Sequence, residues 1–312
     1  MISFSWLILI MSPLLIFMNF NWFLMWVMIE LSTFSFLSIM WNKWFIMVHE
    51  NRMKYFCVQT ISSIFLIFLF CVIYLTKYQW INSTSNFLFF ILLFKLGSVP
   101  FHSWFVNLSK NLNYKNMFIL NTWQKIIPIF MMLIFISITL SIIILLINML
   151  ISVFSQLFSF DIKILLSFSS VSNLSWMLIS ILISLKVILV FCLFYFIVMG
   201  ELMKKLKMLN MKIMNFNLNS IQIKWLFLSL LSISGIPPFL GFIPKWMVLK
   251  NTLSFKWFNI LLILLILTVL NSMIYLRICW NNLFLNFNLV NLKMNYNDNN
   301  ISFMINLSFT LL

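Results

Sequence analysis

Two short stretches decide the fold of this 312-residue chain: KLGSVPFH at residues 95–102 and SGIPPFLGFIPK at residues 234–245. Both contain the pattern Gly-x-x-Pro-Phe, and together they hold three of the chain's four glycines. A proline inside a helix removes a backbone hydrogen bond and interrupts the helix. Because each stretch lies within a long apolar run, we expect a broken helix at each. The expected break residues are Gly97, Pro100, Gly235, Pro237 and Pro238.

The sequence around these stretches is that of an integral membrane protein. It is 63% hydrophobic and 8% charged, with a mean hydropathy of +1.09, whereas a soluble domain has roughly a quarter of its residues charged. Apolar runs of about 17–25 residues recur, and each is long enough to cross a bilayer. We therefore predict an all-α polytopic membrane protein with 10–11 transmembrane helices. The predicted spans lie near residues 2–18, 20–41, 55–76, 86–106, 115–131, 135–158, 161–182, 185–203, 222–250 and 256–276, with a short eleventh candidate at about 299–312.

The basic residues in the connecting loops support this span count. Thirteen of them fall on one side of the predicted membrane, and only Lys77, Lys186, Lys250 and Lys256 fall on the other. Such an excess is what the positive-inside rule predicts, and it places the N-terminus on the basic side. The first span has no basic segment before it and no cleavage site after it, so we interpret it as a membrane helix rather than a signal peptide. The net charge of +15 is thereby explained without nucleic-acid binding.

Four charged residues remain inside the spans: Glu30, Lys95, Lys125 and Lys245. A charge at the centre of a membrane helix costs about 2.5–3.5 kcal/mol, so it usually marks a functional site. Burial disfavours the charged form of a lysine and a nearby carboxylate favours it, so a buried lysine can exchange a proton where an arginine cannot. We predict that these residues form a proton relay. The alternatives are a structural ion pair and, for Lys245, a side chain that reaches the membrane surface.

The two broken stretches also occupy matching positions. Each is the fourth span of a block of five, and two five-span blocks have opposite topology because five is odd. Inverted repeats with broken helices at the midplane are the plan of secondary transporters. We predict two repeats, residues 1–131 and 132–280, followed by a polar linker and a short C-terminal helix at 281–312.

Soluble enzyme chemistry is not indicated. The chain has no glycine-rich nucleotide loop and no cluster of metal ligands. Its cysteines are far apart in sequence, which indicates neither a disulfide nor a metal site; they are Cys57, Cys71, Cys192 and Cys279. Of the two histidines, we expect His49 in a solvated loop, whereas His102 follows the first break and is a candidate relay residue.

The motifs resemble the chain 2 family of the mitochondrial NADH-ubiquinone oxidoreductase, one of the antiporter-like membrane subunits of respiratory complex I. The resemblance runs in order over residues 20–280. It is carried by WVMIEL at 26–31, FKLG at 94–97, PFHSW at 100–104, TWQKIIP at 122–128, SSVSNLSWM at 169–177, GIPPFLGF at 235–242 and PKW at 244–246.

The resemblance implies a role for each buried charge. Glu30 matches a glutamate that pairs with Lys95, Lys125 matches a bridging lysine, and Lys245 matches the lysine that faces the exit half-channel. Asn173 stands where many members have histidine, which puts a protonatable relay at that position in doubt.

The resemblance also implies the surroundings of the chain. The expected partners are other membrane-arm subunits of complex I, protons and water, and the lipids of the mitochondrial inner membrane, among which cardiolipin is a candidate. The N-terminus would face the matrix. We expect no cofactor in this chain, because NADH, FMN, iron–sulfur clusters and ubiquinone would be bound by partner subunits. A stand-alone cation/proton antiporter and a purely structural membrane subunit are the alternatives.

Overall fold

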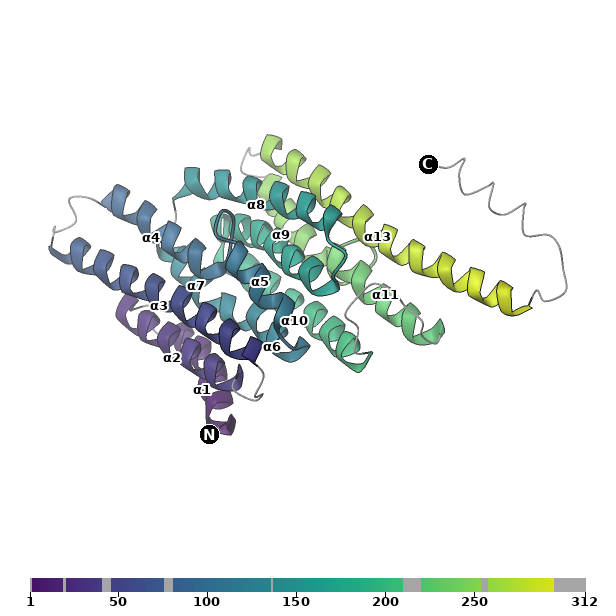
Figure 1. Cartoon of the computed structure of the whole chain (residues 1–312). Helices are drawn as coiled ribbons and strands as arrows, with labels where there is room; N and C mark the ends of the chain where they lie inside the picture. Colours follow the sequence, from purple (N-terminus) through teal and green to yellow (C-terminus); the bar gives the residue numbers. More distant parts are fainter. Residues whose placement is uncertain are drawn as a thin grey trace.

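The computed structural model describes residues 2–18, 21–40, 46–75, 81–135, 137–209, 220–253 and 258–294. These residues form thirteen α-helices and no sheet. Figure 1 shows the helices side by side, with α1 to α4 at one end of the assembly and α11 and α13 at the other.

The helices correspond to the ten predicted spans. By length and composition, seven of them can cross a membrane: α2, α3, α6 with α7, α8, α9, α10 and α13. The other three contain shorter apolar helices, in α1, α4 and α11. Seven spans are single helices: α1 (Ile2–Met18), α2 (Trp22–Met40), α3 (Ile46–Leu75), α8 (Ile138–Phe158), α9 (Ile162–Ile183), α10 (Leu185–Met208) and α13 (Phe258–Met294). Three are divided: α4 (Ile81–Leu96) with α5 (Ser103–Asn111), α6 (Tyr114–Asn121) with α7 (Trp123–Ile134), and α11 (Ser220–Ser234) with α12 (Phe242–Thr252). The predicted span at 299–312 lies outside the described residues.

Both predicted breaks are confirmed, and a glycine begins each of them. Gly97 has φ +66° and Gly235 has φ +78°, values that residues with a Cβ atom rarely adopt. A Cβ atom on Gly97 would also lie 2.6 Å from the Cβ of Phe105. The sequence therefore ends α4 and α11 at positions that other residues would not tolerate.

Side chains from other helices satisfy the backbone carbonyls at the first break. Trp104 Nε1 donates to the carbonyl of Phe94 at 3.2 Å, and Gln59 Nε2 donates to the carbonyl of Lys95 at 3.4 Å. In a membrane every backbone polar group needs such an internal partner. The carbonyls of Phe94 and Lys95 at the break are thus satisfied by side chains of α5 and α3.

A third break, between α6 and α7, was not predicted. Thr122 separates the two helices with φ −117° and ψ −72°, and its hydroxyl donates to the carbonyl of Phe118 at 2.6 Å. The span predicted at 115–131 is therefore two helices that meet three residues before Lys125.

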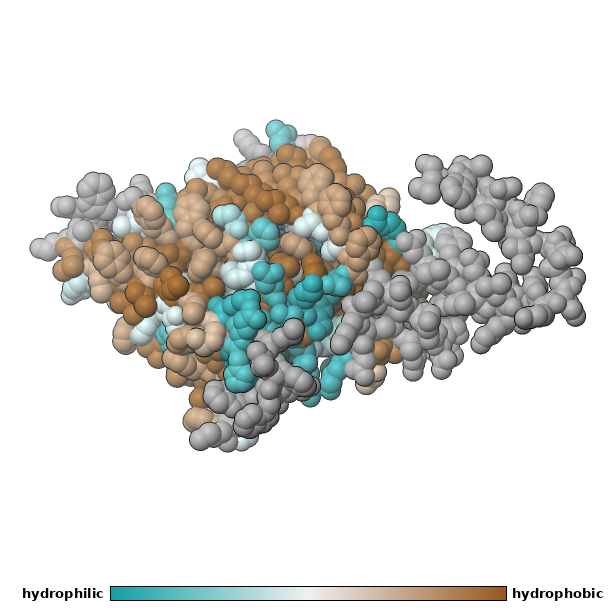
Figure 2. Space-filling view, viewed as in Figure 1, coloured by the Kyte–Doolittle hydropathy of each residue, from teal (hydrophilic) through white to brown (hydrophobic). Residues whose placement is uncertain are grey.

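Helix α9 lies at the centre of the bundle and packs against α5, α7, α8, α10 and α12. Of the residues in its most apolar segment, 94% are buried, far more than in the other long spans except α6–α7. Its sequence is nonetheless rich in serine, SFSSVSNLSW at residues 167–176. The outer helices instead expose apolar residues such as Phe68 and Ile266, and brown, hydrophobic side chains cover the flanks in Figure 2, with a hydrophilic patch over the ends of α5 and α6. The serine-rich helix is thus buried at the centre, while the flanks of the bundle are apolar.

The expectation that His49 lies in a loop was wrong. Helix α3 begins at Ile46, so His49 is an exposed residue within its first turns. On the same helix Lys54 donates to Glu50 at 2.5 Å, a surface pair at i and i+4. Such pairs stabilise a helix in water, which extends α3 beyond the apolar run.

Candidate functional site, a buried polar axis

The three lysines that the sequence singled out are all buried, with 4% of Lys95, 3% of Lys125 and 6% of Lys245 exposed. Each lies beside a helix break. Lys95 is in the last turn of α4, Lys125 is the third residue of α7, and Lys245 is the fourth residue of α12. The alternative that the Lys245 side chain reaches the membrane surface does not fit this burial.

Glu30 is half-buried on α2, which packs against α1, α3 and α7. The expected pair is not a direct contact in this structure. Glu30 Oε1 and Lys95 Nζ are both buried, and neither has a hydrogen-bond partner among the described residues. Buried polar atoms are nearly always paired, with protein or with water. Glu30 and Lys95 therefore each keep unfilled hydrogen-bonding capacity in the interior.

Gln124 connects the Glu30 region to Lys125. Its Oε1 accepts hydrogen bonds from the Tyr55 hydroxyl at 3.3 Å and from Ser32 Oγ at 3.5 Å. Its Nε2 donates to the carbonyl of Ser32 at 3.2 Å. One side chain on α7 thus binds α2 and α3, next to the lysine that the sequence assigned as the bridge.

Lys125 points toward α9, where its Nζ donates to the carbonyl of Ser170 at 3.2 Å. The same ammonium lies 4.9 Å from the centroid of the Phe105 ring. A carbonyl and the face of an aromatic ring both favour the charged form of a lysine. Lys125 therefore joins the first half of the chain to the serine-rich helix at its centre.

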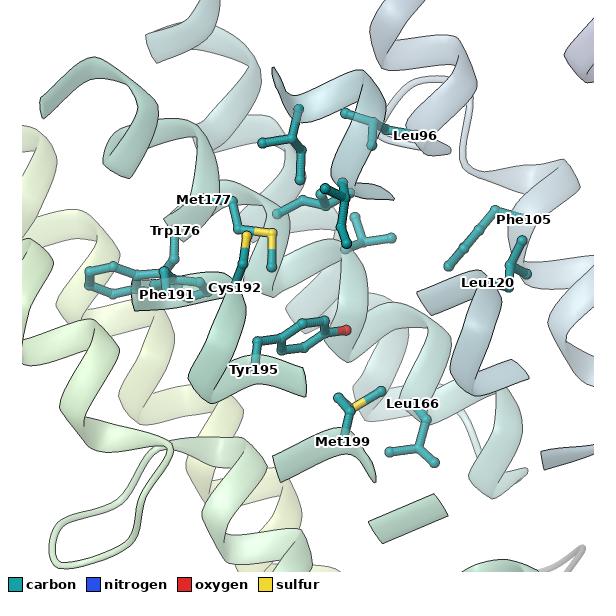
Figure 3. Packing of buried hydrophobic residues seen from close by; sticks show 14 of the residues in the cluster. Leu96, Phe105, Leu120, Leu166, Trp176, Met177, Phe191, Cys192, Tyr195 and Met199 are labelled. Carbon is teal, nitrogen blue, oxygen red and sulfur yellow. The ribbon is translucent and has the colours of Figure 1, made fainter. Parts of the chain in front are cut away.

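The polar groups described so far run from Glu30 through Gln124 and Lys125 to α9, and we call this line the polar axis. Two buried tyrosines extend it, and the sequence analysis did not identify them. The hydroxyls of Tyr195 on α10 and Tyr275 on α13 are buried and make no hydrogen bond with another described residue. The hydroxyls of Ser170 and Ser169 on α9 lie close to Tyr195 and Tyr275, respectively. Figure 3 shows the Tyr195 hydroxyl projecting from α10 into the middle of the bundle.

Lys245 closes the axis at the second break. Its Nζ donates to the carbonyl of Ser234, the last residue of α11, at 2.6 Å. A small cavity of about 20 Å³ lies beside it, with Asn173 and Tyr195 also in its wall. A space of that size with polar groups around it holds about one water molecule. Asn173 thus faces the same space as Tyr195.

His102 is half-buried just before α5, and its ring centroid lies 6.0 Å from that of Phe168. Its Nδ1 is buried and has no partner among the described residues. Nearby, Asn148 Oδ1 accepts a hydrogen bond from the backbone of Val99 at 2.6 Å, while its Nδ2 is unpartnered. His102 is thus a polar group near the first break with spare hydrogen-bonding capacity. In the part of the chain that the structure describes, no three His, Cys, Asp or Glu side chains gather as a metal ligand set.

Comparisons with known proteins agree with this arrangement. Residues 19–271 match the family described as NADH:quinone oxidoreductase/Mrp antiporter, transmembrane. The NADH-ubiquinone oxidoreductase chain 2 of Anopheles gambiae is 31% identical over 304 residues, which cover 94% of this chain and 89% of the relative. That of Artemia franciscana is 32% identical over 256 residues, 80% of each chain.

Solved structures share the fold at low sequence identity. A chain of respiratory complex I from Thermus thermophilus superposes with a TM-score of 0.73 at 16% identity, over 83% of this chain. A chain of the Mrp complex from Dietzia sp. DQ12-45-1b gives 0.72 at 18% identity, over 82%. The present chain spans 65% and 55% of the lengths of those two chains. The helical fold with broken spans is therefore that of an antiporter-like membrane subunit.

Proposed function

The chain belongs to the NADH:quinone oxidoreductase/Mrp antiporter family of membrane proteins, among the NADH-ubiquinone oxidoreductase chain 2 sequences, and on that premise we propose that it translocates protons as a core membrane subunit of a respiratory NADH:ubiquinone oxidoreductase. It lies in the mitochondrial inner membrane with its N-terminus on the matrix side. Electron transfer takes place in partner subunits, where NADH, FMN, iron–sulfur clusters and ubiquinone bind.

The observation that carries this proposal is the contact between Lys125 and α9. Lys125 Nζ binds the carbonyl of Ser170, the side chain of Ser170 lies near the Tyr195 hydroxyl, and Tyr195 lines the small cavity beside Lys245. A buried charge is costly and is retained mainly where it has a function. Three buried lysines, two of them linked through polar groups of α9 and α10, are more than helix packing requires.

Each residue has a distinct role in the relay. The charge of Glu30 stabilises a proton on Lys95, so a change at Glu30 changes the tendency of Lys95 to release it. Lys125 receives protons from the first half of the chain and passes them along the serine face of α9. Lys245 holds the last proton at the C-terminal end of α11, and His102 is an additional relay group near the first break.

The alternatives differ in their expected biochemistry. A stand-alone antiporter would not purify with an NADH-oxidising assembly. A purely structural subunit would tolerate an uncharged residue at position 125, provided that the complex assembles. The scarcity of carboxylates inside the spans also disfavours cation coordination, for which oxygen ligands are preferred.

The test is Lys125→Met in the assembled complex, reconstituted into vesicles, with protons moved per NADH oxidised as the measurement. The matched control is Lys54→Met, which removes a lysine that is 49% exposed and belongs to a surface pair. We expect the Lys125 variant to lose proton transport, or NADH oxidation together with it, while the control keeps both. An assembled Lys125 variant with unchanged rate and stoichiometry would refute the relay.

A further inference from the structure

A large groove opens on the outside of the bundle, away from the polar axis. Its volume is about 860 Å³, toward the upper end of the range of ligand-binding pockets. Helices α1 and α10 form its two sides, and α6 and α7 form its floor. Figure 1 shows α6 between α1 and α10 at one end of the bundle. Because α10 packs on α6 while α1 has no packed interface with α10, the space between them is left unfilled.

The wall of the groove is apolar and aromatic. Trp6 and Ile10 of α1 face Phe196 and Ile197 of α10 across it, with Trp123 of α7 below. The position of Trp123 is fixed, because its Nε1 donates to the carbonyl of Leu9 and its ring lies 5.8 Å from that of Phe196. These side chains offer a hydrocarbon surface that water would not fill.

The rim of the groove is cationic. Lys115 at the start of α6 and Lys204 and Lys207 near the end of α10 line it, together with one carboxylate, Glu201. All four are exposed, and their side chains make no hydrogen bond or ion pair with another described residue. Three ammonium groups and one carboxylate leave a net charge of +2. The lysines belong to the side of the membrane where the sequence concentrates its basic loop residues.

Glycine at position 200 helps to form the groove. It is the only glycine within a described helix, where glycine is normally unfavourable by comparison with alanine. A Cβ atom there would meet only the ring of Phe118, at 3.5 and 3.7 Å. Helix packing therefore does not require the glycine, and a larger side chain at this position would project into the groove.

We propose that this groove binds one anionic phospholipid that carries two phosphates, with its acyl chains along α1 and α10 and its phosphates on Lys115, Lys204 and Lys207. Basic pockets between membrane helices on the matrix or cytoplasmic side bind such headgroups, and the net rim charge of +2 matches two phosphates. A smooth helix surface would exchange lipids freely, whereas a groove of about 860 Å³ holds a molecule in one place. A partner helix would have to place carboxylates opposite all three ammonium groups to satisfy the same rim.

The test uses photo-crosslinking in the purified, intact complex. Diazirine-bearing cardiolipin, phosphatidylglycerol and phosphatidylcholine are added separately, and labelled peptides of α1 and α10 are quantified by mass spectrometry. We expect strong labelling by the cardiolipin probe. A lysine near an anionic headgroup contributes about fivefold in affinity, so Lys204→Gln with Lys207→Gln should weaken this labelling by about 25-fold at limiting lipid.

Two further variants separate headgroup recognition from acyl-chain binding. Gly200→Leu fills the groove without changing any charge and should also abolish the labelling. Lys205→Gln is the matched control, because Lys205 lies on the same helix but donates to the carbonyl of Trp225 on α11 and does not line the groove. Equal labelling by all three lipids, undiminished labelling of the Gly200→Leu variant, or no labelling by any lipid would overturn the proposal. None of these results depends on proton transport.

Discussion

Gly235→Ala is the substitution that tests most directly how the second break positions Lys245. The glycine has φ +78°, and a Cβ atom on it would lie 2.6 Å from Lys245 Nζ and 2.9 Å from its Cδ and Cε. The obstructed atoms belong to a flexible side chain, so the lysine can move away. The ammonium would then leave the carbonyl of Ser234, to which it now donates at 2.6 Å.

Two effects set the magnitude of this change. Alanine in a left-handed conformation costs about 1–2 kcal/mol, which lowers the stability of the break without unfolding a chain of this size. A hydrogen bond to a charged group contributes about 1.5–3 kcal/mol. Losing it would reduce the population of Lys245 at the end of α11 by roughly 10- to 150-fold. The expected result is a complex that assembles but moves fewer protons per NADH.

The measurement is the proton-to-NADH ratio in reconstituted vesicles, with the amount of assembled complex determined by native gel. Gly200→Ala is the control, since the same chemical change there makes only ordinary contacts with Phe118 and should stabilise α10 by about 0.5–1 kcal/mol. If Gly235→Ala assembles normally and keeps the full ratio, then the contact between Lys245 and Ser234 has no part in proton transport.

Three further predictions concern single contacts, two beside the axis and one on the surface. Tyr195→Phe removes a buried hydroxyl beside the cavity of Lys245 and should slow proton transport while leaving assembly intact; an unchanged rate would exclude the tyrosine from the relay. Gln124→Leu removes the acceptor of the Tyr55 hydroxyl and should destabilise the chain by about 1–3 kcal/mol, measured as a lower midpoint of thermal dissociation of the complex. Glu50→Gln breaks the exposed pair with Lys54 and should change the same midpoint very little, because such pairs contribute about 0–1 kcal/mol; a large shift would mean that this face is buried in the complex.

The sequence was sufficient where one local signal determined the structure. The spans followed from apolar length, and the breaks at Gly97 and Gly235 followed from glycine and proline. The break at Thr122 has no such signal. It depends on tertiary contacts, because Trp123 binds the carbonyl of Leu9 on α1 and Lys125 binds that of Ser170 on α9.

The three lysines lie in the interior, as their place in the apolar runs indicated, whereas the contacts that they make have no signature in the sequence. A tyrosine in an apolar run ordinarily indicates packing, so nothing in the sequence distinguished Tyr195 and Tyr275 from the other aromatic residues. The expected pair of Glu30 and Lys95 depends on the relative placement of α2 and α4, which no local pattern encodes. The division into repeats at 1–131 and 132–280, and the individual relay roles, stay predictions.

Each broken helix places a lysine at the C-terminal end of its first half-helix, but the lysine precedes the glycine in one case and follows it in the other. Lys95 precedes its glycine and belongs to the last turn of α4, whereas Lys245 follows its glycine by ten residues and reaches back to the last carbonyl of α11. In both cases the lysine is associated with the C-terminal end of a half-helix, where the helix dipole favours a positive charge. This stabilisation offsets part of the cost of burying an ammonium group, and it is lost if the half-helix end moves. A displacement of either break would therefore change how tightly its lysine holds a proton, which is the property that a coupled proton pump requires.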